Sequence, residues 1–351
     1  MAALPPIIAR IPAAESGIGA PELLQKIVAS GNVSHQGVAE SDARFQFPDF
    51  RRAQRLIELF GEKTTMRVWR LDELRWRVDE LDPIGERGTY SDPSGLWVWN
   101  SGRRHGTQIE GHADVRFARS ADLVPSELGR RLAAAASPDE TARLPARRIA
   151  GVHAAGLRIS PRSPTTTLER IDMWADPRTG LAVAVEITPR GGDVMISSEF
   201  LDIDFKAPER EVLAFDLPED ATHNHADVAD FAGAVDRYSP FVLPDRLTSL
   251  SRRTSIARAA ATYGSGFDLV AALVLRRRFA PFQTEELERV PEVSGDFGTG
   301  RLLETSLLNG LYIERDGVVY MVAGTVTSDV LIDVAEALVD DLEPSFVRGL
   351  E

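Results

Sequence analysis

Apolar and polar residues alternate with a period of two on both sides of the segment DPRTG at residues 176–180. This alternation predicts two half-buried strands within residues 170–187. Proline presets φ and glycine takes the positive φ that closes a turn, so the segment between the strands predicts a hairpin. A third run covers residues 194–205. Its apolar residues change parity part of the way along, which predicts a β-bulge near Ser198 and Glu199.

The chain before this hairpin alternates between helical and strand patterns. Apolar residues recur at helical spacing in two segments, the second with Asp49 as N-cap. Strand patterns separated by short turns follow, and connections this short require antiparallel neighbours. The predicted elements are a helix at residues 21–30, a strand at 34–47, a helix at 50–60, a meander of strands at 64–109, a helix at 125–136, and the beginning of another helix at 137–144 with Ser137 as cap.

A polar segment without periodicity, LPEDATHNH at residues 217–225, predicts a boundary between two domains. The chain beyond it opens with a predicted helix and continues with short strands, two of which are joined by a hairpin turn at Asp316 and Gly317. It closes with an amphipathic helix. The elements predicted there are helices at residues 226–238 and 327–341 and strands at 257–264, 267–276, 300–305, 307–315 and 318–324.

These patterns predict an α+β fold, because helices interrupt runs of antiparallel strands and do not alternate regularly with them. A chain of 351 residues is also long for a single core. We expect a flexible N-terminal segment at residues 1–20, a larger domain at 21–220 and a smaller α+β domain at 226–351. In the larger domain, a single curved sheet with helices on one face would leave an apolar cleft.

Composition narrows the classes of function. The formal net charge is −13 and the isoelectric point is near 5.1. Since a nucleic-acid surface needs a basic footprint, we do not predict a nucleic-acid-binding protein. Absence of cysteine from the sequence excludes thiol nucleophiles and disulfides. The sequence has no run of roughly 18 apolar residues, so we predict no transmembrane segment in it. Residues 1–19 lack the apolar core of a signal peptide, so the protein is either cytosolic or an exported domain without its leader.

Recognisable catalytic motifs are missing from the sequence: it has no Gly-x-Ser-x-Gly elbow, no His-Glu-x-x-His and no P-loop. We therefore predict neither an enzyme nor a cofactor. Histidine is the commonest metal ligand at neutral pH, and two groups of residues could converge on a metal. They are His105, His112 and Asp114, and the pair His223 and His225. Both groups lie in polar segments, where exposed histidine is the usual explanation, so no metal site is predicted.

Pairs of arginines recur along this acidic chain. Their scatter favours surface solvation, or pairing with carboxylates, over the binding of a polyanion. Contact of one pair with a partner or a lipid headgroup is the alternative. The clusters are Arg51 and Arg52, Arg103 and Arg104, Arg130 and Arg131, Arg147 and Arg148, Arg252 and Arg253, and Arg276 to Arg278.

Several aromatic and aliphatic side chains on the predicted strands have two interpretations. They form an ordinary core, since apolar strand faces usually pack against helices. Alternatively, they line a cleft for acyl chains or another apolar ligand, which needs area and shape but few polar groups. The residues are Trp76, Val78, Trp97, Trp99, Met173, Val183 and Val185.

Three parts of the sequence are distinctive in content and order. They are PELLQKIVASGNVSHQGVAE, then RVWRLDELRWRVDELD followed by LWVWNS, then RRIAGVHAAGLRISPRSPTTTLERIDMWADPRTGLAVAVEI followed by FLDIDF. Together they resemble the LolA-like fold of bacterial envelope proteins, in particular the actinobacterial type related to LolA and to the sigma-factor regulatory protein RseB (MucB).

This resemblance implies an unclosed antiparallel β-barrel whose concave apolar face is covered by helices and receives acyl chains of lipids or lipoproteins. RseB-like members carry a second, smaller domain that contacts an anti-sigma factor, and residues 226–342 would correspond to it. LolA lacks such a domain, so the length of this chain favours the RseB-like branch. Both branches act outside the cytoplasmic membrane, which favours an exported or membrane-tethered domain with its leader removed.

We therefore predict a non-enzymatic, extracytoplasmic, RseB-like protein that binds an acyl lipid or lipoprotein in the half-barrel and regulates an anti-sigma-factor partner of the envelope stress response. The ligand would displace or re-seat the helix predicted at residues 21–30 or at 50–60. The alternative is a LolA-like carrier of lipids or lipoproteins in the cell envelope. From a different class, an uncharacterised hydrolase is the further alternative, although no nucleophile and base occur at a recognisable spacing.

Overall fold

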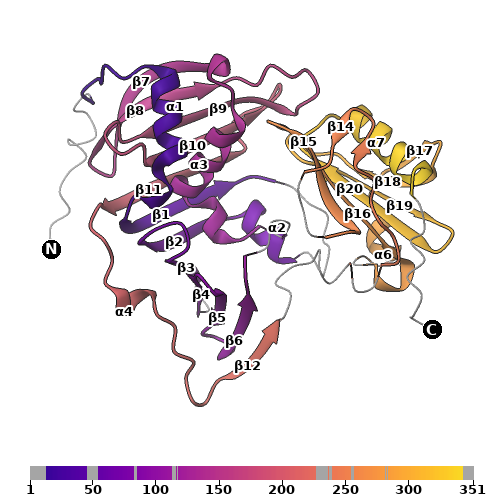
Figure 1. Cartoon of the computed structure of the whole chain (residues 1–351), viewed down its shortest axis with the longest axis horizontal. Coiled ribbons are helices and arrows are strands. Elements are labelled where there is room, and N and C mark those ends of the chain that lie inside the picture. Colours follow the sequence, from indigo (N-terminus) through magenta and orange to yellow (C-terminus); the bar gives the residue numbers. More distant parts are fainter. Residues whose placement is uncertain are drawn as a thin grey trace.

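The structure is a computed structural model. It describes residues 13–45, 54–82, 85–112, 118–226, 239–253, 257–280 and 284–342, together with residues 116, 236 and 282. Within these residues, most strands belong to two sheets, a larger one in the first part of the chain and a smaller one in the second (Figure 1). The predicted α+β fold class is confirmed.

The larger sheet contains twelve strands in the described part of the chain, in the order β12-β6-β5-β4-β3-β2-β1-β11-β10-β9-β8-β7. Neighbouring strands are antiparallel except for β12, which runs parallel to β6. The edge strands β12 and β7 do not pair with each other, so the sheet is an unclosed barrel, as predicted. The strands are β1 (His35–Ala43), β2 (Lys63–Arg70), β3 (Trp76–Asp82), β4 (Gly85–Asp92), β5 (Gly95–Asn100), β6 (His105–Glu110), β7 (Thr141–Ile149), β8 (Val152–Ile159), β9 (Leu168–Ala175), β10 (Ala182–Pro189), β11 (Ile196–Asp204) and β12 (Thr222–Ala226).

Two helices cover the part of this sheet formed by strands β7 to β11, and they contact each other (Figure 1). They are α1 (Ala20–Ala29) and α3 (Pro125–Ala135), both within one residue of the predicted helices. Helix α1 buries Leu23, Leu24 and Ile27 along one stripe, and each contributes about 2 kcal/mol by leaving water. Helix α3 approaches β10 at Gly129, where an added Cβ would lie 2.6 Å from the Cβ of Ala182.

Shorter helices connect the strands. The helix predicted at residues 50–60 is present as α2, and its predicted first residues lie outside the described part of the chain. The shorter helices and 3₁₀ turns of the larger unit are η2 (Ser30–Asn32), α2 (Gln54–Gly61), η3 (Ser120–Leu123), η4 (Pro138–Glu140) and α4 (Arg210–Leu213).

Strands β9 and β10 form the predicted hairpin, in which Met173 lies opposite Val185. The turn closes at Gly180, whose φ is +76°. The Gly180 amide donates a hydrogen bond to the carbonyl oxygen of Asp176 at 2.8 Å. The positive φ is the conformation for which glycine was expected in this turn.

The β-bulge of strand β11 lies at Leu201. The residues before and after Leu201 pair with two consecutive residues of β1, which leaves Leu201 without a place in the pairing. Its side chain is 49% exposed. The predicted position near Ser198 and Glu199 is therefore wrong, because both residues pair with β1 in regular register. Ser198 points inward and its hydroxyl donates to the carbonyl oxygen of Leu123 at 2.5 Å. Because Ser198 is polar although it points inward, the pattern of apolar residues does not show which positions of this strand face the core.

Residues 137–144 do not begin a helix. Ser137 does act as a cap, but for the single 3₁₀ turn η4, in which the Glu140 carboxylate accepts a hydrogen bond from the Ser137 amide at 2.9 Å. Strand β7 begins directly afterwards and pairs with β8. The predicted boundary segment at residues 217–225 likewise contains most of strand β12, which pairs with β6. Strand β12 pairs with residues distant in the sequence, so local patterns do not reveal it. Strands β7 and β8 form a local hairpin whose turn is Ala150 and Gly151, and the Ser137 cap was mistaken for the beginning of a helix there.

The smaller sheet has six strands in the described residues, in the order β15-β16-β20-β19-β18-β17. Helix α7 packs on it (Figure 1). Leu331, Val334 and Leu338 of this helix are buried. The helix predicted at residues 226–238 lies outside the described part except for residues 226 and 236. The elements are β13 (Arg246–Leu247), β14 (Leu250–Ser251), β15 (Ala260–Ser265), β16 (Asp268–Arg276), η5 (Arg277–Phe279), α6 (Thr284–Leu287), β17 (Glu292–Gly295), β18 (Gly298–Leu303), β19 (Asn309–Arg315), β20 (Val318–Gly324) and α7 (Ser328–Asp340).

The two units meet at the loop between β8 and β9. The Thr165 hydroxyl donates to the carboxylate of Asp268 at 2.9 Å, and the Thr167 hydroxyl donates to the carbonyl oxygen of Leu307 at 2.6 Å. Phe267 and Leu307 of the smaller unit are buried in the core cluster of the larger unit. Among the described residues, no helix is long and apolar enough to cross a membrane.

Candidate functional site

The seven side chains that sequence analysis placed at an apolar cleft fall into three groups. Two line a pocket beside α3, two lie on the other face of the sheet, and three are sealed in the core. In that order, the groups are Trp76 and Val78, then Trp97 and Trp99, then Met173, Val183 and Val185.

Trp97 and Trp99 lie on the sheet face opposite to Trp76. Trp97 is paired with Tyr90, and Tyr90 is paired with Arg77. Directly paired residues share a face, whereas Trp76 precedes Arg77 along β3 and therefore points to the other side. These two tryptophans cannot line one cleft together with Trp76. The short turns of the meander fix this register, and aromatic content alone does not reveal it.

An aromatic cluster surrounds Phe215 on this outer face. The centroid of its ring lies 4.9 Å from that of Tyr90, 5.0 Å from Trp97 and 5.8 Å from Trp99. The Arg77 guanidinium stacks over the Tyr90 ring at 4.5 Å. A groove of about 290 Å³ borders the cluster. Ring contacts of this kind attach the segment after α4 to the sheet.

Met173, Val183 and Val185 are each 0% exposed. Met173 and Val185 belong to the core cluster that also contains Leu23 and Ile27 of α1. They have the environment of an ordinary packed core. A ligand would reach them only if a covering helix moved, so their part in ligand binding stays a prediction.

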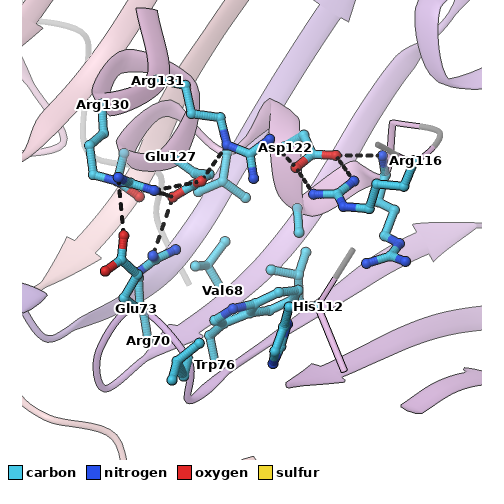
Figure 2. Close-up of a pocket in the computed structure, with 16 residues that line it drawn as sticks. Val68, Arg70, Glu73, Trp76, His112, Arg116, Asp122, Glu127, Arg130 and Arg131 are labelled. Carbon is cyan, nitrogen blue, oxygen red and sulfur yellow. Dashed lines mark hydrogen bonds and ion pairs between the residues drawn. The ribbon is translucent and has the colours of Figure 1, made fainter. Parts of the chain in front are cut away.

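The pocket beside Trp76 has charged side chains at half of its lining positions. It encloses about 350 Å³ between strands β2 and β3 and the segment that leads into α3 (Figure 2). Its apolar wall includes Val68, Trp76 and Val78. We call it the arginine pocket, because its described lining contains Arg70, Arg116, Arg119, Arg130 and Arg131 together with the carboxylates of Glu73, Asp122 and Glu127.

Glu127, in the first turn of α3, is the centre of one group of ion pairs. Its carboxylate lies 3.2 Å from Arg70 and 3.0 Å from Arg130, and it also accepts a hydrogen bond from Arg131. Its side chain is 8% exposed and that of Arg70 is 11% exposed. Arg130 extends to Glu73 at 3.1 Å, and Figure 2 shows it between the two carboxylates. These contacts attach α3 to the end of β2.

Asp122 is the centre of a second group of ion pairs. Its two carboxylate oxygens accept hydrogen bonds from the two terminal nitrogens of Arg116, at 2.7 Å each. The Arg119 amide also donates to this carboxylate at 2.8 Å. Arg131 lies 3.1 Å from Asp122 and contacts Glu127 as well, so it joins the two groups. A bidentate guanidinium–carboxylate contact is among the strongest ion pairs in geometry and energy.

The arginines keep both inner carboxyl groups ionised. Burial alone would raise the pKa of Glu127, but the charges of the three arginines that contact it outweigh burial and lower this pKa. The pKa of Asp122 is lowered in the same way, against the effect of burial, chiefly by Arg116. Burial lowers the pKa of Arg70, although Glu127 counteracts it.

His35 connects the helix at the pocket to the central strand β1. Its Nδ1 lies 2.8 Å from the carbonyl oxygen of Val33, and its Nε2 lies 3.0 Å from the hydroxyl of Ser126 in α3. A neutral ring that donates from Nδ1 and accepts at Nε2 satisfies both contacts. Burial, which outweighs the opposing contact with Val33 and is reinforced by the charge of Arg70, lowers the pKa of His35 to about 4.

The sequence pattern does not reveal the arginine pocket. The scatter of the arginine pairs favours surface solvation or pairing with carboxylates, and Arg130 and Arg131 do contact Glu127 at i+3 and i+4 spacing. The unused signal is Arg70, which has the same parity as the buried apolar residues of β2 and therefore points inward. A charged residue in such a position needs a partner from another element.

The histidine groups do not form a metal centre in the described residues. The ring nitrogens of His105 each lie 2.8 Å from a side-chain oxygen, one of Thr222 and one of Asn224. These contacts hold the parallel strand β12 against β6. Asp114, the third member of one predicted group, lies outside the described residues.

The fold defines a class of protein: an open, mostly antiparallel sheet covered by helices, followed by a smaller sheet unit with its own helix. No family model matches the sequence, and no curated protein matches it. Among solved structures, the chain is similar to MucB of Pseudomonas aeruginosa in its complex with MucA, with a TM-score of 0.53 and 16% identity over 93% of this chain and 98% of that chain. A second structure of MucB, in complex with MucA(peri), gives a TM-score of 0.51 and 17% identity with the same coverage.

A LolA superfamily protein from Nitrosomonas europaea aligns with 57% of this chain and 99% of its own, at 11% identity and a TM-score of 0.25. The two MucB structures, which match both units, confirm the RseB (MucB)-like fold that the sequence resemblance implied.

Proposed function

We propose that this chain is a non-enzymatic, extracytoplasmic protein of the RseB (MucB) kind, which regulates a membrane-bound partner by binding it. The extent of the structural match carries this proposal: it includes both units and 98% of the MucB chain. A carrier built on the half-barrel alone would match the first unit only. Since a fold hosts many functions, the proposal depends on a partner that can be tested directly.

The proposed partner is the extracytoplasmic part of an anti-sigma factor, the partner that the sequence resemblance implies. MucA is bound to MucB in both of the similar complexes, which supports a protein partner for this chain. We assign the main contact to the predicted smaller domain at residues 226–351.

Reconstitution tests this proposal. Photocrosslinking from positions on the smaller sheet, in the cells that produce the protein, would first identify the partner. Its extracytoplasmic segment would then be titrated into the full chain by calorimetry, and we expect a one-to-one complex with a Kd of about 1 µM or lower. A folded chain that captures no envelope protein in cells would overturn the proposal.

An apolar ligand in the larger unit is the second part of the proposal. Met173 and Val185 are packed under α1, so an acyl chain would take the place of apolar side chains of a covering helix, α1 or α2. The ligand then shifts the equilibrium between two positions of this helix. The size of the shift depends on how much more tightly the ligand binds one position than the other.

Native mass spectrometry of the purified protein, followed by organic extraction and lipid identification, tests this second part. A co-purifying acyl lipid would support a ligand site, and Val185→Trp should then reduce its occupancy by filling the site. A protein that carries no lipid and takes up no fluorescent fatty acid would contradict it. Transfer of the lipid between vesicles, without a protein partner, would favour a LolA-like carrier instead.

A further inference from the structure

We propose that the arginine pocket binds a carboxylate side chain of a partner polypeptide, in the place that Glu73 occupies in the free protein. This inference rests on the proposed function, because it assigns a chemistry to one contact of a protein partner. It adds a site on the larger unit to the contact assigned to the smaller one.

Arginines outnumber carboxylates in the part of the arginine pocket around Glu127. Arg70, Arg130 and Arg131 all contact Glu127, and Glu73 is the second carboxylate there. A guanidinium also has more N–H donors than a carboxylate can accept from it alone. The side chains of Glu127, Arg70 and Arg130 are 8%, 11% and 21% exposed, and opposite charges attract more strongly where little water reaches them. The pocket therefore favours an additional carboxylate.

Glu73 is the carboxylate that an incoming group can replace at the lowest cost. It comes from the loop between β2 and β3, and its side chain is 53% exposed, compared with 8% for Glu127 and 14% for Asp122. An exposed ion pair such as Glu73 with Arg130 stabilises by about 0–1 kcal/mol. Breaking a buried pair costs several times as much. Exchange at Glu73 is thus nearly neutral, and the ligand gains from its remaining contacts.

The surface around Glu73 favours an aliphatic residue next to the acid. Leu74 follows Glu73, lines the same pocket and is 43% exposed. Figure 2 shows Val68 and Trp76 of the apolar wall close to the charged groups, and Val78 lines the same pocket. A volume of about 350 Å³ is at the lower end for ligand pockets, so it admits one or two side chains and not a long acyl chain. A short acidic–aliphatic peptide segment fits these features.

The test is a titration of the full chain with two blocked seven-residue peptides, one with Glu-Leu at its centre and one with Gln-Leu. Arginine Nε–Hε signals in NMR spectra report binding at the guanidinium groups. We expect the Glu peptide to bind about tenfold more tightly than the Gln peptide, because it makes charge-assisted hydrogen bonds. Inorganic phosphate is titrated in parallel.

Two variants and a matched control locate the site. Glu73→Gln removes the internal competitor and should tighten binding of the Glu peptide about two- to fivefold. Arg130→Gln removes the cation and should weaken binding about tenfold. Arg67→Gln, on the same strand as Arg70 but in an exposed pair with Glu86, should leave binding unchanged.

The outcomes separate this inference from the proposed function. Equal binding of the two peptides, or no effect of Glu73→Gln, overturns the pocket as a peptide site even if the partner titration succeeds. Phosphate that binds with the same arginine shifts, while neither peptide does, also overturns it in favour of a small anion. A Glu-specific response that Glu73→Gln strengthens supports the inference, and it does so even if calorimetry finds no envelope partner.

Discussion

At the residue scale, burial determines how the charged side chains between β2 and α3 affect stability. Arg70 and Glu127 have side chains only 11% and 8% exposed, so each has lost most of its hydration. Their mutual attraction offsets this loss only while both are present. The presence of this ion pair therefore does not by itself show that it stabilises the fold. It does mean that the position of α3 depends on each charged side chain that contacts Glu127.

Replacement of Glu127 by glutamine leaves three arginines without their shared anion. We expect the free energy of unfolding to fall by about 3–5 kcal/mol, measured by urea denaturation. The matched control is Glu86→Gln, because Glu86 also pairs with an arginine, Arg67, at 3.2 Å, but both side chains are nearly half exposed. The control should cost less than about 1 kcal/mol. Equal losses in the two variants would contradict the importance of burial.

His35 makes stability depend on pH. Its pKa is lowered to about 4 in the fold by burial, so the folded protein holds the neutral ring. Below about pH 6.5 the unfolded chain binds a proton that the folded chain does not, and the free energy of unfolding therefore falls as pH falls toward the folded pKa. Between pH 6.5 and pH 5 this amounts to about 2 kcal/mol.

Urea denaturation at a series of pH values measures this effect, and His35→Gln should remove the slope in that interval. The groups that face His35 do not obscure it: Arg70 stays charged throughout, and the lowered pKa of Glu127 confines its titration to more acidic solution. A wild-type stability that is constant from pH 7 to 5 would be inconsistent with a buried neutral ring.

At the scale of single elements, the turn between β9 and β10 determines how closely α1 can approach. Gly180 has a φ of +76°, and a Cβ placed there would lie 2.2 Å from the carbonyl oxygen of Lys26 in α1. The Lys26 ammonium in turn donates to the carbonyl oxygen of Pro177 at 2.9 Å. The helix and the hairpin therefore fit only if this position has no side chain.

Gly180→Ala should separate this steric effect from backbone strain. A positive φ alone costs alanine about 1 kcal/mol, and displacement of α1 should bring the total to about 3 kcal/mol or more. Gly151→Ala is the control, because Gly151 also has a positive φ, +83°, but no atom lies within 4 Å of its added Cβ. Urea denaturation and hydrogen exchange in α1 measure both variants, and similar losses would show that contact with α1 is unimportant.

Elements with strong local periodicity could be predicted from the sequence, and those defined by distant pairing could not. The alternation around the DPRTG turn identified β9 and β10, and helical spacing identified α1, α3 and α7. Strand β12 is polar and owes its place to β6, so its sequence carries no signal. The same reason explains the site: Arg70 of β2 and Arg130 of α3 meet at the Glu127 carboxylate only because α3 packs against the end of β2.

At the scale of the whole molecule, α3 connects the arginine pocket to the smaller unit. Its first turn carries Glu127, while Ala133 near its other end shares a core cluster with Phe267 and Leu307. Eleven residues of helix span about 16 Å. If a ligand moves α3 at the pocket, we therefore expect the surface on which the smaller unit rests to change as well.

Leu307→Ala tests whether that surface holds the two units in one arrangement. Leu307 is 5% exposed, and its truncation should cost about 2–5 kcal/mol, because a cavity forms in a core that both units share. We also expect small-angle scattering to report a larger radius of gyration. The neighbouring Leu308 is 37% exposed, so Leu308→Ala should change neither quantity. A destabilised Leu307→Ala protein with unchanged scattering would mean that Leu307 only fills the core, and that the threonine contacts of the loop between β8 and β9 fix the arrangement. Larger dimensions would mean instead that apolar burial fixes it, which is the condition under which movement of α3 can be transmitted to the smaller unit.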